Sequence, residues 1–260
     1  MKADFDKAAQ NYDTTFTNTV IGKLQRNLVY ESLSQILITK KPKTILEINC
    51  GTGEDAIWLA KQNFDVVATD ISSTMIEMAK SKSDIENLTF QQADINSITV
   101  NFSTKKFDLL FSNFGGLNCL SITELTSFFK NASQLVSEKG QLVLVIMPKN
   151  TIWEQFYFSL KLDFKNAFRR KKEFAIANVD GEKIKTYYYN PKDIVNLANA
   201  NFEIKQVNPV GVFIPPSYLE AFFKNKPKWI GFLNAFEQKV KNRSWLSKYA
   251  DHYVIVLEKK

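Results

Sequence analysis

Acidic and small residues between positions 44 and 72 form the pattern with the clearest chemistry in this chain. Glu47 lies near the end of an apolar run, Asn49, Gly51 and Gly53 form a small-residue turn, and Asp70 ends the next apolar run. Small turn residues let a ligand approach the backbone, and an acid at a strand end accepts hydrogen bonds from ribose hydroxyls. The pattern therefore predicts a βαβ unit that binds a nucleoside.

The residues that open the following helix distinguish between two kinds of nucleoside. A dinucleotide site uses G-x-G-x-x-G and places a pyrophosphate at the helix N-terminus. Here Glu54 and Asp55 occupy the first helical positions, and two carboxylates would repel a pyrophosphate. S-adenosylmethionine, which carries a sulfonium and an ammonium group and no phosphate, fits this turn better. A nicotinamide-dependent dehydrogenase is left as the most distant alternative.

Four segments in order resemble the motifs of class I S-adenosylmethionine-dependent methyltransferases. They read EINCGTG (47–53), VATDIS (67–72), FQQADI (90–95) and FDLLFSN (107–113). The resemblance implies an enzyme that uses S-adenosyl-L-methionine and releases S-adenosyl-L-homocysteine. It also implies a set of cofactor-binding residues at strand ends, namely Glu47, Asn49, Gly51, Gly53, Asp70, Ile71, Asp94, Ile95 and Asn113.

The first motif departs from the family in one position, where Asn49 replaces the usual glycine. Asparagine is the residue other than glycine that best tolerates a left-handed backbone. We therefore expect a left-handed Asn49 that keeps the turn intact. The alternative is a turn that no longer binds the cofactor.

The N-terminal segment also resembles that of many small-molecule methyltransferases. Phe5, Asp6, Tyr12 and Asp13 carry this resemblance, which implies that the segment folds over the cofactor with Tyr12 near the methionine end. Arg26, on a helix predicted over residues 22–37, is a candidate fork for the cofactor carboxylate. The alternative for Arg26 is an ordinary surface position.

The order of elements predicts an α/β fold. Strands are expected over residues 44–48, 65–69, 88–92, 107–112 and 140–147, with helices between most of them, and right-handed crossovers then give a Rossmann-like, doubly wound, seven-stranded sheet. A helix is also expected over residues 217–224. The last strand, residues 252–258, is expected to be antiparallel. The length favours one domain over residues 1–260. Its expected parts are an N-terminal helical cap (1–40), a cofactor-binding core (41–150), an inserted lid (151–190) and the C-terminal part of the sheet (191–260).

Two regions are expected to form the substrate side. The family resemblance places the loop of residues 113–119 beside the transferable methyl group, and the loop lacks the Asn-Pro-Pro-Tyr type of tetrad found in amino-directed nucleic-acid methyltransferases. Within 151–190, an aromatic helix is followed by a hairpin whose turn is Asp180-Gly181. The aromatic stripe is either a lid over an apolar acceptor or part of the core. The predicted substrate-binding residues are Phe114, Asn118, Trp153 and Tyr157.

The positive charge of the chain is compatible with several kinds of binding partner. The formal net charge is +7, and a basic cluster between Lys161 and Lys172 is interpreted as a solvated helix face. An anionic substrate, a membrane surface and nucleic acid are the alternatives for that cluster. His252, the only histidine, is a weak candidate for a general base, and a structural role is its alternative.

Cysteine content and hydropathy indicate the compartment. Cys50 and Cys119 suggest neither a metal site nor a disulfide, the N-terminus is polar, and no apolar run has the length of a membrane span. We therefore expect a cytoplasmic protein.

Three functions remain in competition. The first is methyl transfer by direct displacement to a small, apolar or aromatic acceptor. The second is methylation of RNA or another nucleic acid, and the third is cofactor binding without transferase activity. The sequence leaves the acceptor atom and the oligomeric state open.

Overall fold

A computed structural model of the chain describes residue 6 and residues 9–179 and 181–260. The predictions for Phe5 and Asp180 lie outside the described residues. No helix in the described part is long and apolar enough to cross a membrane.

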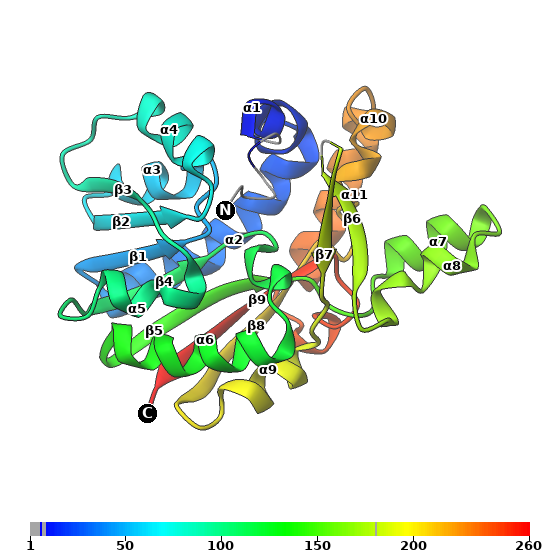
Figure 1. The fold of residues 1–260 in the computed structure, drawn as a ribbon. Coiled ribbons are helices and arrows are strands. Elements are labelled where there is room, and N and C mark those ends of the chain that lie inside the picture. Colours follow the sequence, from blue (N-terminus) through cyan, green and yellow to red (C-terminus); the bar gives the residue numbers. More distant parts are fainter. Residues whose placement is uncertain (1–5, 7–8, 180) are drawn as a thin grey trace.

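The core is one seven-stranded sheet in the order β3-β2-β1-β4-β5-β9-β8, which confirms the predicted α/β fold (Figure 1). The first five strands are parallel, and β9 runs antiparallel to both of its neighbours, as expected. The longest strand, β5, begins four residues before the predicted start at residue 140. The strands are β1 (Thr44–Ile48), β2 (Asp65–Asp70), β3 (Leu88–Gln92), β4 (Phe107–Ser112), β5 (Val136–Ile146), β8 (Phe202–Val210) and β9 (His252–Lys259).

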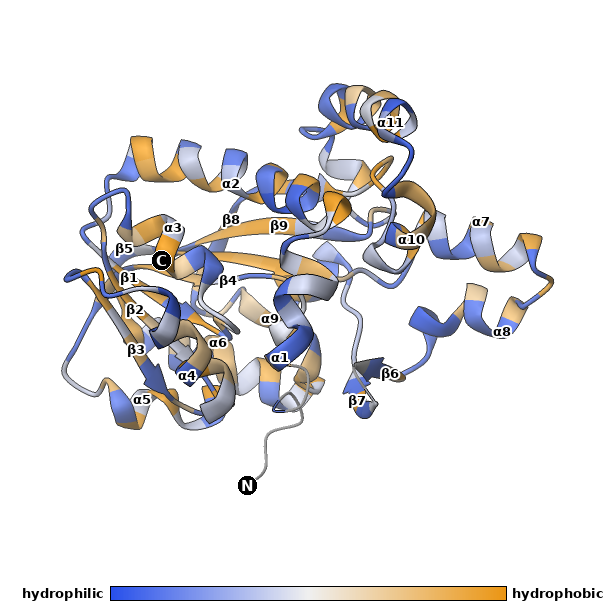
Figure 2. Ribbon diagram, turned by 90° about the horizontal axis from the view of Figure 1, so that it is seen from above, coloured by the Kyte–Doolittle hydropathy of each residue, from blue (hydrophilic) through white to orange (hydrophobic). Residues whose placement is uncertain are grey.

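Side chains alternate between the two faces of the sheet, because successive residues of a strand point in opposite directions. In β1, Ile45 packs under α2 and α3, and Leu46 packs under α6 and α9. Figure 2 shows hydrophobic residues concentrated along these strands. The helices that cover the sheet are α2 (Val20–Lys40), α3 (Glu54–Ala60), α4 (Ser73–Lys82), α6 (Ile122–Leu135) and α9 (Pro191–Ala198), with a short α5 (Ile98–Asn101) before β4.

The N-terminal segment lies against the first two motifs. It consists of α1 (Ala9–Tyr12) and a π-helical turn (Asp13–Thr17) before α2. Thr52 Oγ1 donates a hydrogen bond of 2.6 Å to Asp13 Oδ1, and Lys82 forms an ion pair with the same carboxylate. Ser72 Oγ donates to Asp6 Oδ1 at 2.6 Å. These bonds hold the segment at the glycine-rich turn.

The insertion between β5 and α9 forms helices and a hairpin outside the seven-stranded sheet, and it returns to the core at Tyr189 (Figure 1). Its elements are α7 (Ile152–Leu160), α8 (Phe164–Ala167), a 3-10 turn (Arg169–Lys171) and a separate hairpin of β6 (Ala175–Val179) and β7 (Glu182–Thr186). The single basic helix face predicted here is wrong. The helix breaks after Leu160, where Leu162 has a φ of 57°, and Arg170 is buried in ion pairs.

The C-terminal region also differs from its prediction. The helix expected over residues 217–224 is a 3-10 turn (Ser217–Leu219) followed by the one-turn α10 (Glu220–Phe223). The next helix, α11 (Pro227–Val240), begins with proline at its first position, where the missing N–H has no helical partner to lose.

Gly53 is a position where the fold requires glycine, and Gly53→Ala is expected to destabilise the protein. Its φ is +81°, and an added Cβ would lie 2.7 Å from Phe90 Cζ and 2.9 Å from Ala79 Cβ. Left-handed strain and overpacking together are expected to lower the free energy of unfolding by about 2–4 kcal/mol, measured by urea denaturation.

Gly181→Ala is the matched control, since its φ is +87° and nothing lies within 4 Å of the added Cβ. It isolates the backbone strain, so we expect a loss of only about 1–2 kcal/mol. Equal losses in the two variants would contradict the packing argument.

Candidate functional site

The carboxyl ends of β1, β2 and β4 bring the predicted site residues to one edge of the sheet, where ligands of such sheets bind. Asn49 has a φ of 57°, which confirms the predicted left-handed conformation. The loop after β4 passes close to it, because a Cβ on Gly116 would lie 2.5 Å from Asn49 Nδ2. Gly116 therefore leaves the room that the larger asparagine needs.

Asp70 is locked in place by backbone donors. Gly51 N–H donates to Asp70 Oδ2 and Ser72 N–H donates to Asp70 Oδ1, both at 2.9 Å. Burial raises the pKa of Asp70, although these two N–H groups oppose the rise. Each carboxylate oxygen keeps an acceptor site, so Asp70 can still accept hydrogen bonds from vicinal hydroxyls.

Glu47 is the most deeply buried of the predicted cofactor-binding acids. Its side chain is 1% exposed, and its Oε2 has no hydrogen-bond partner among the described residues. Burial, reinforced by the negative charge of Asp55, holds the pKa of Glu47 well above its usual value, and Arg26 acts in the opposite direction. A cationic ligand group beside Oε2 would stabilise the ionised carboxylate and so lower its pKa.

Arg26 is buried within a network of polar side chains. The alternative prediction, that Arg26 lies on the surface, is therefore wrong. Arg26 is 7% exposed, and its Nε lies 3.4 Å from Asp55 Oδ1. Tyr30 OH donates to Asp55 Oδ1 at 2.7 Å, and Asn113 Nδ2 donates to Asp55 Oδ2 at 3.0 Å. The sequence presented Asp55 only as a charge at a helix N-terminus, whereas the fold makes it the partner that orients Arg26 and Asn113.

The site fits S-adenosylmethionine in its donor and acceptor groups. Glu47 Oε2 is an unpaired acceptor suited to an ammonium, and Arg26 Nη1 is a buried donor without a hydrogen-bond partner, suited to a carboxylate. Asp70 suits the ribose. Three carboxylates, Glu47, Asp55 and Asp70, accompany the single guanidinium, so the surroundings favour a cationic ligand. The cofactor roles of these residues remain predictions.

Aromatic rings gather next to Arg26. Phe114 makes edge contacts with Phe16 (centroids 5.0 Å apart) and His252 (5.4 Å), and the Arg26 guanidinium lies 5.5 Å from the Phe114 centroid. Tyr12 stands 5.8 Å from Phe16, and its Cε1 lies 4.0 Å from the Cβ position of Gly51. Burial raises the pKa of Tyr12 to about 12, so the phenol is neutral at working pH.

The other predicted cofactor residues lie farther along the same edge. Ile71 is exposed directly after β2, and Asp94 and Ile95 follow β3. Asp94 Oδ1 accepts the N–H of Asn96 at 2.9 Å and caps the short 3-10 turn that Ile95 begins. No contact in the described residues excludes Ile71, Asp94 or Ile95 from a ligand.

The four predicted substrate residues do not form one cluster. Asn118 is fully buried, and its amide bonds to backbone groups of Met147 and Tyr187. Its geometry therefore favours a structural role that ties the loop to the insertion. Trp153 packs against Phe223, and Tyr157 packs against Tyr218. Among the four, only Phe114 belongs to the aromatic group around Arg26.

His252 lies beside a network of buried ion pairs that the sequence did not suggest. Arg170 Nη2 bonds to Glu154 Oε1 and Asp251 Oδ1, both at 2.8 Å, and Asp251 Oδ2 lies 3.2 Å from His252 Nδ1. Burial alone would raise the pKa of Asp251, but His252 and Arg170 hold it below its usual range. Asp251 can therefore orient the imidazole, and the base role of His252 stays a prediction.

Arg170→Met is expected to destabilise the protein by about 3–5 kcal/mol at neutral pH, because two buried carboxylates lose the fully buried guanidinium that they share. The low pKa of Asp251 means that its ionised form stabilises the fold above pH about 4, and that this contribution is lost as the pH falls. The cost of the substitution should therefore shrink in acid, as measured by urea denaturation at several pH values.

Arg169→Met is the control for that variant. Arg169 bonds only to Glu154 and its side chain is 31% exposed, so its loss should cost about 1 kcal/mol. Equal costs for the two variants would contradict the network.

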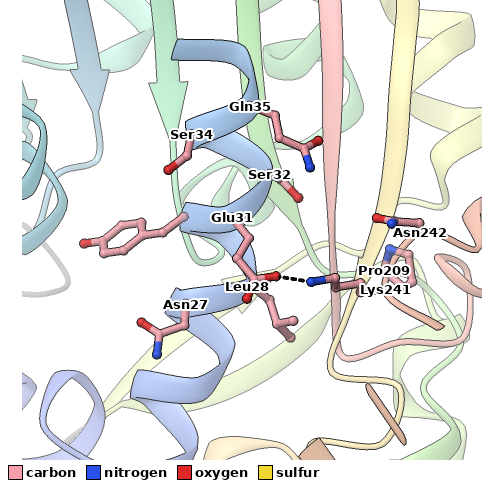
Figure 3. A pocket seen from close by; sticks show the side chains of 10 residues that line it. Asn27, Leu28, Glu31, Ser32, Ser34, Gln35, Pro209, Lys241 and Asn242 are labelled. Carbon is pink, nitrogen blue, oxygen red and sulfur yellow. Dashed lines mark hydrogen bonds and ion pairs between the residues drawn. The ribbon is translucent and has the colours of Figure 1, made fainter. Parts of the chain in front are cut away.

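A separate groove lies on the outer side of α2, away from the glycine-rich turn (Figure 3). Ser32, Gln35 and Asn242 contribute to its polar lining, and an ion pair between Glu31 and Lys241 crosses it. It shares only Tyr30 with the network described above, so the candidate site and the groove are distinct.

Comparisons with known proteins bear on the class of protein and on its fold. A family described as methyltransferase domain matches residues 45–140. An uncharacterized protein of Methanocaldococcus jannaschii is 28% identical over 254 residues, covering 94% of this chain and 92% of that protein. The demethylmenaquinone methyltransferase of Bacillus licheniformis is 26% identical, covering 59% of this chain and 66% of that enzyme.

A solved structure shows the same fold. The magnesium protoporphyrin IX methyltransferase of Synechocystis, with bound SAH, superposes with a TM-score of 0.57 at 14% identity, covering 91% of this chain and 83% of that one. The family match over residues 45–140 and the shared fold support membership of the class I S-adenosylmethionine-dependent methyltransferases. The chain is an enzyme, and S-adenosylmethionine is its cofactor.

Proposed function

We propose that this methyltransferase acts on a small, largely apolar or aromatic acceptor by direct displacement. The observation that carries the proposal is the group of Phe16, Phe114 and His252 beside buried Arg26. When bound, the cofactor supplies an already activated methyl group. The protein then has to orient the acceptor and exclude water, and a wall of aromatic rings does both.

The named relatives support an acceptor of this kind. Demethylmenaquinone and magnesium protoporphyrin IX, the acceptors in their names, both contain unsaturated ring systems. The identities are low, so they support the chemical class and no particular acceptor.

His252 is the proposed base for acceptors that need one. The Asp251 carboxylate lies 3.2 Å from its Nδ1, so it would stabilise the imidazolium that forms when Nε2 takes up a proton. A carboxylic acid is already ionised at working pH and would not depend on it, whereas a phenol, whose pKa is about 10, would be helped by a base.

Two broader proposals follow from the same residues. We propose a single domain over residues 1–260, supported by one sheet whose strands run from Thr44 to Lys259. We also propose a cytoplasmic location, supported by the presence of only two cysteines among 260 residues. Methylation of nucleic acid has less support, because Arg169 and Arg170 of the basic cluster are paired with Glu154.

The experiment is transfer of labelled methyl from S-adenosylmethionine to a panel of phenols, quinols, porphyrins, aromatic carboxylates and RNA. The expected result is turnover of a ring-containing small molecule, with a KM that rises about tenfold or more in Phe114→Ala. Methylation of RNA, with no methylation of any small molecule in the panel, would contradict the proposal. Ile38→Ala, an exposed change on α2, is the control and should leave KM unchanged.

A further inference from the structure

The outer face of α11 carries aromatic side chains that are largely exposed to solvent, although Phe236 also packs against Phe213. Trp229, Phe232 and Phe236 stand at i, i+3 and i+7, so they form one stripe along the helix. They are between 36% and 65% exposed, whereas Ile230 and Glu237 on the neighbouring face are buried. A contiguous exposed apolar stripe of this kind marks an interaction surface.

The charges beside this stripe have one sign. Lys224, Lys228 and Lys239 are exposed, and Lys226 lies over the ring of Phe222. Glu237 is the only acid between residues 224 and 240. It is buried, and it accepts four backbone N–H groups of residues 211–214. The stripe is therefore bordered by uncompensated positive charge.

A second helix at the same end of the molecule repeats the pattern. In α7, Ile152, Phe156 and Leu160 stand at i, i+4 and i+8 and are between 44% and 69% exposed, opposite buried Glu154. Lys161 and Lys165 follow directly and are exposed. Figures 1 and 2 both place α7, α8, α10 and α11 at one end, away from β3 and α4.

We propose that this end of the enzyme docks on the surface of an anionic lipid bilayer. The rings of α11 and the apolar stripe of α7 enter the boundary between headgroups and acyl chains, and the lysines contact the anionic headgroups. Lysine stems can lie along apolar surface while their ammonium groups stay in water. A protein partner is the less favoured occupant, because the cores of protein interfaces are depleted in lysine.

The proposal is independent of the acceptor, since lipid binding requires neither cofactor nor substrate. A docked enzyme would, however, have direct access to acceptors dissolved in the bilayer. Trp153 of α7 packs against Phe223 of α10, and α10 contacts α11, so the two docking helices are connected through α10.

The test is flotation of the purified full-length protein with vesicles of phosphatidylcholine, with and without phosphatidylglycerol. We expect binding to the anionic vesicles only, weakened by salt. Trp229→Ser with Phe232→Ser, and separately Lys228→Glu with Lys239→Glu, should each weaken binding by about tenfold or more. Tryptophan emission should shift to the blue on binding, and Trp229→Phe should remove most of that shift while preserving flotation.

Matched controls lie on the other parts of the fold. Val100→Ser with Ile122→Ser removes two exposed apolar residues of α5 and α6, and Lys61→Glu with Lys80→Glu reverses two exposed charges near α3 and α4. Both controls should float like the wild type. Absence of flotation, equal loss in controls and variants, or a protein dimer that the stripe variants dissociate would overturn the proposal.

Discussion

Asp70→Asn is expected to weaken binding of S-adenosylhomocysteine by about 100-fold or more. The carboxylate accepts the N–H groups of Gly51 and Ser72, and an amide nitrogen would meet one of these donors with another donor. The substitution also removes the charged acceptor for the ribose, and hydrogen bonds to charged groups contribute about 1.5–3 kcal/mol each. Calorimetric titration of both proteins measures the difference.

Asp65→Asn is the control for this experiment, because Asp65 is an exposed acid at the opposite end of β2. It should bind S-adenosylhomocysteine like the wild type. Wild-type affinity in Asp70→Asn would show that the ribose is held elsewhere. A wild-type melting temperature would establish that weak binding does not reflect unfolding.

Glu47→Gln is expected to weaken S-adenosylhomocysteine binding by about 10–100-fold, because the amide keeps the shape of the carboxylate and loses its charge. Methylthioadenosine has the adenosine and the sulfur but lacks the amino acid, so its affinity should change little. This pair of ligands tests the contact with the ammonium directly. Equal losses for both ligands would contradict it and indicate a disturbed turn.

The pH dependence of binding provides a second readout. The pKa of Glu47 is raised by burial, so part of the free enzyme carries a neutral carboxyl there when the pH is below that raised pKa. A carboxylate paired with an ammonium must first lose this proton. Affinity for S-adenosylhomocysteine should therefore rise as the pH increases through the raised pKa and then level off, and Glu47→Gln should lack this rise.

The strands were predictable because their chemistry is local. The runs 44–48, 88–92 and 107–112 were expected and are the observed β1, β3 and β4. The runs 44–48 and 107–112 are buried and mainly apolar, as expected of central strands, whereas 88–92 forms the edge strand and buries only Phe90. Helix ends were less certain, since α2 extends from residue 20 to residue 40 and the segment after Pro216 forms only short turns.

In the insertion after β5, the local spacing of basic residues led to a wrong prediction. Lys161, Lys165 and Arg169 have helical spacing, which favoured one solvated face. The chain instead turns at Leu162, and Arg170 reaches Asp251, which is 81 positions away in the sequence. No local signal specifies such a pair, because its energy arises only when both charges are buried together.

The sequence by itself determined the fold class, the cofactor and the strand ends at which Glu47, Asn49 and Asp70 stand, because small-residue turns and strand-end acids are read from neighbouring positions. Only the tertiary structure showed that Asp55 contacts Arg26 and Asn113. It also showed that the Asn118 amide bonds to the backbone of the insertion, and that the aromatic stripe on α11 is exposed. These outcomes depend on which distant surfaces meet, and that is set by the packing of the whole chain.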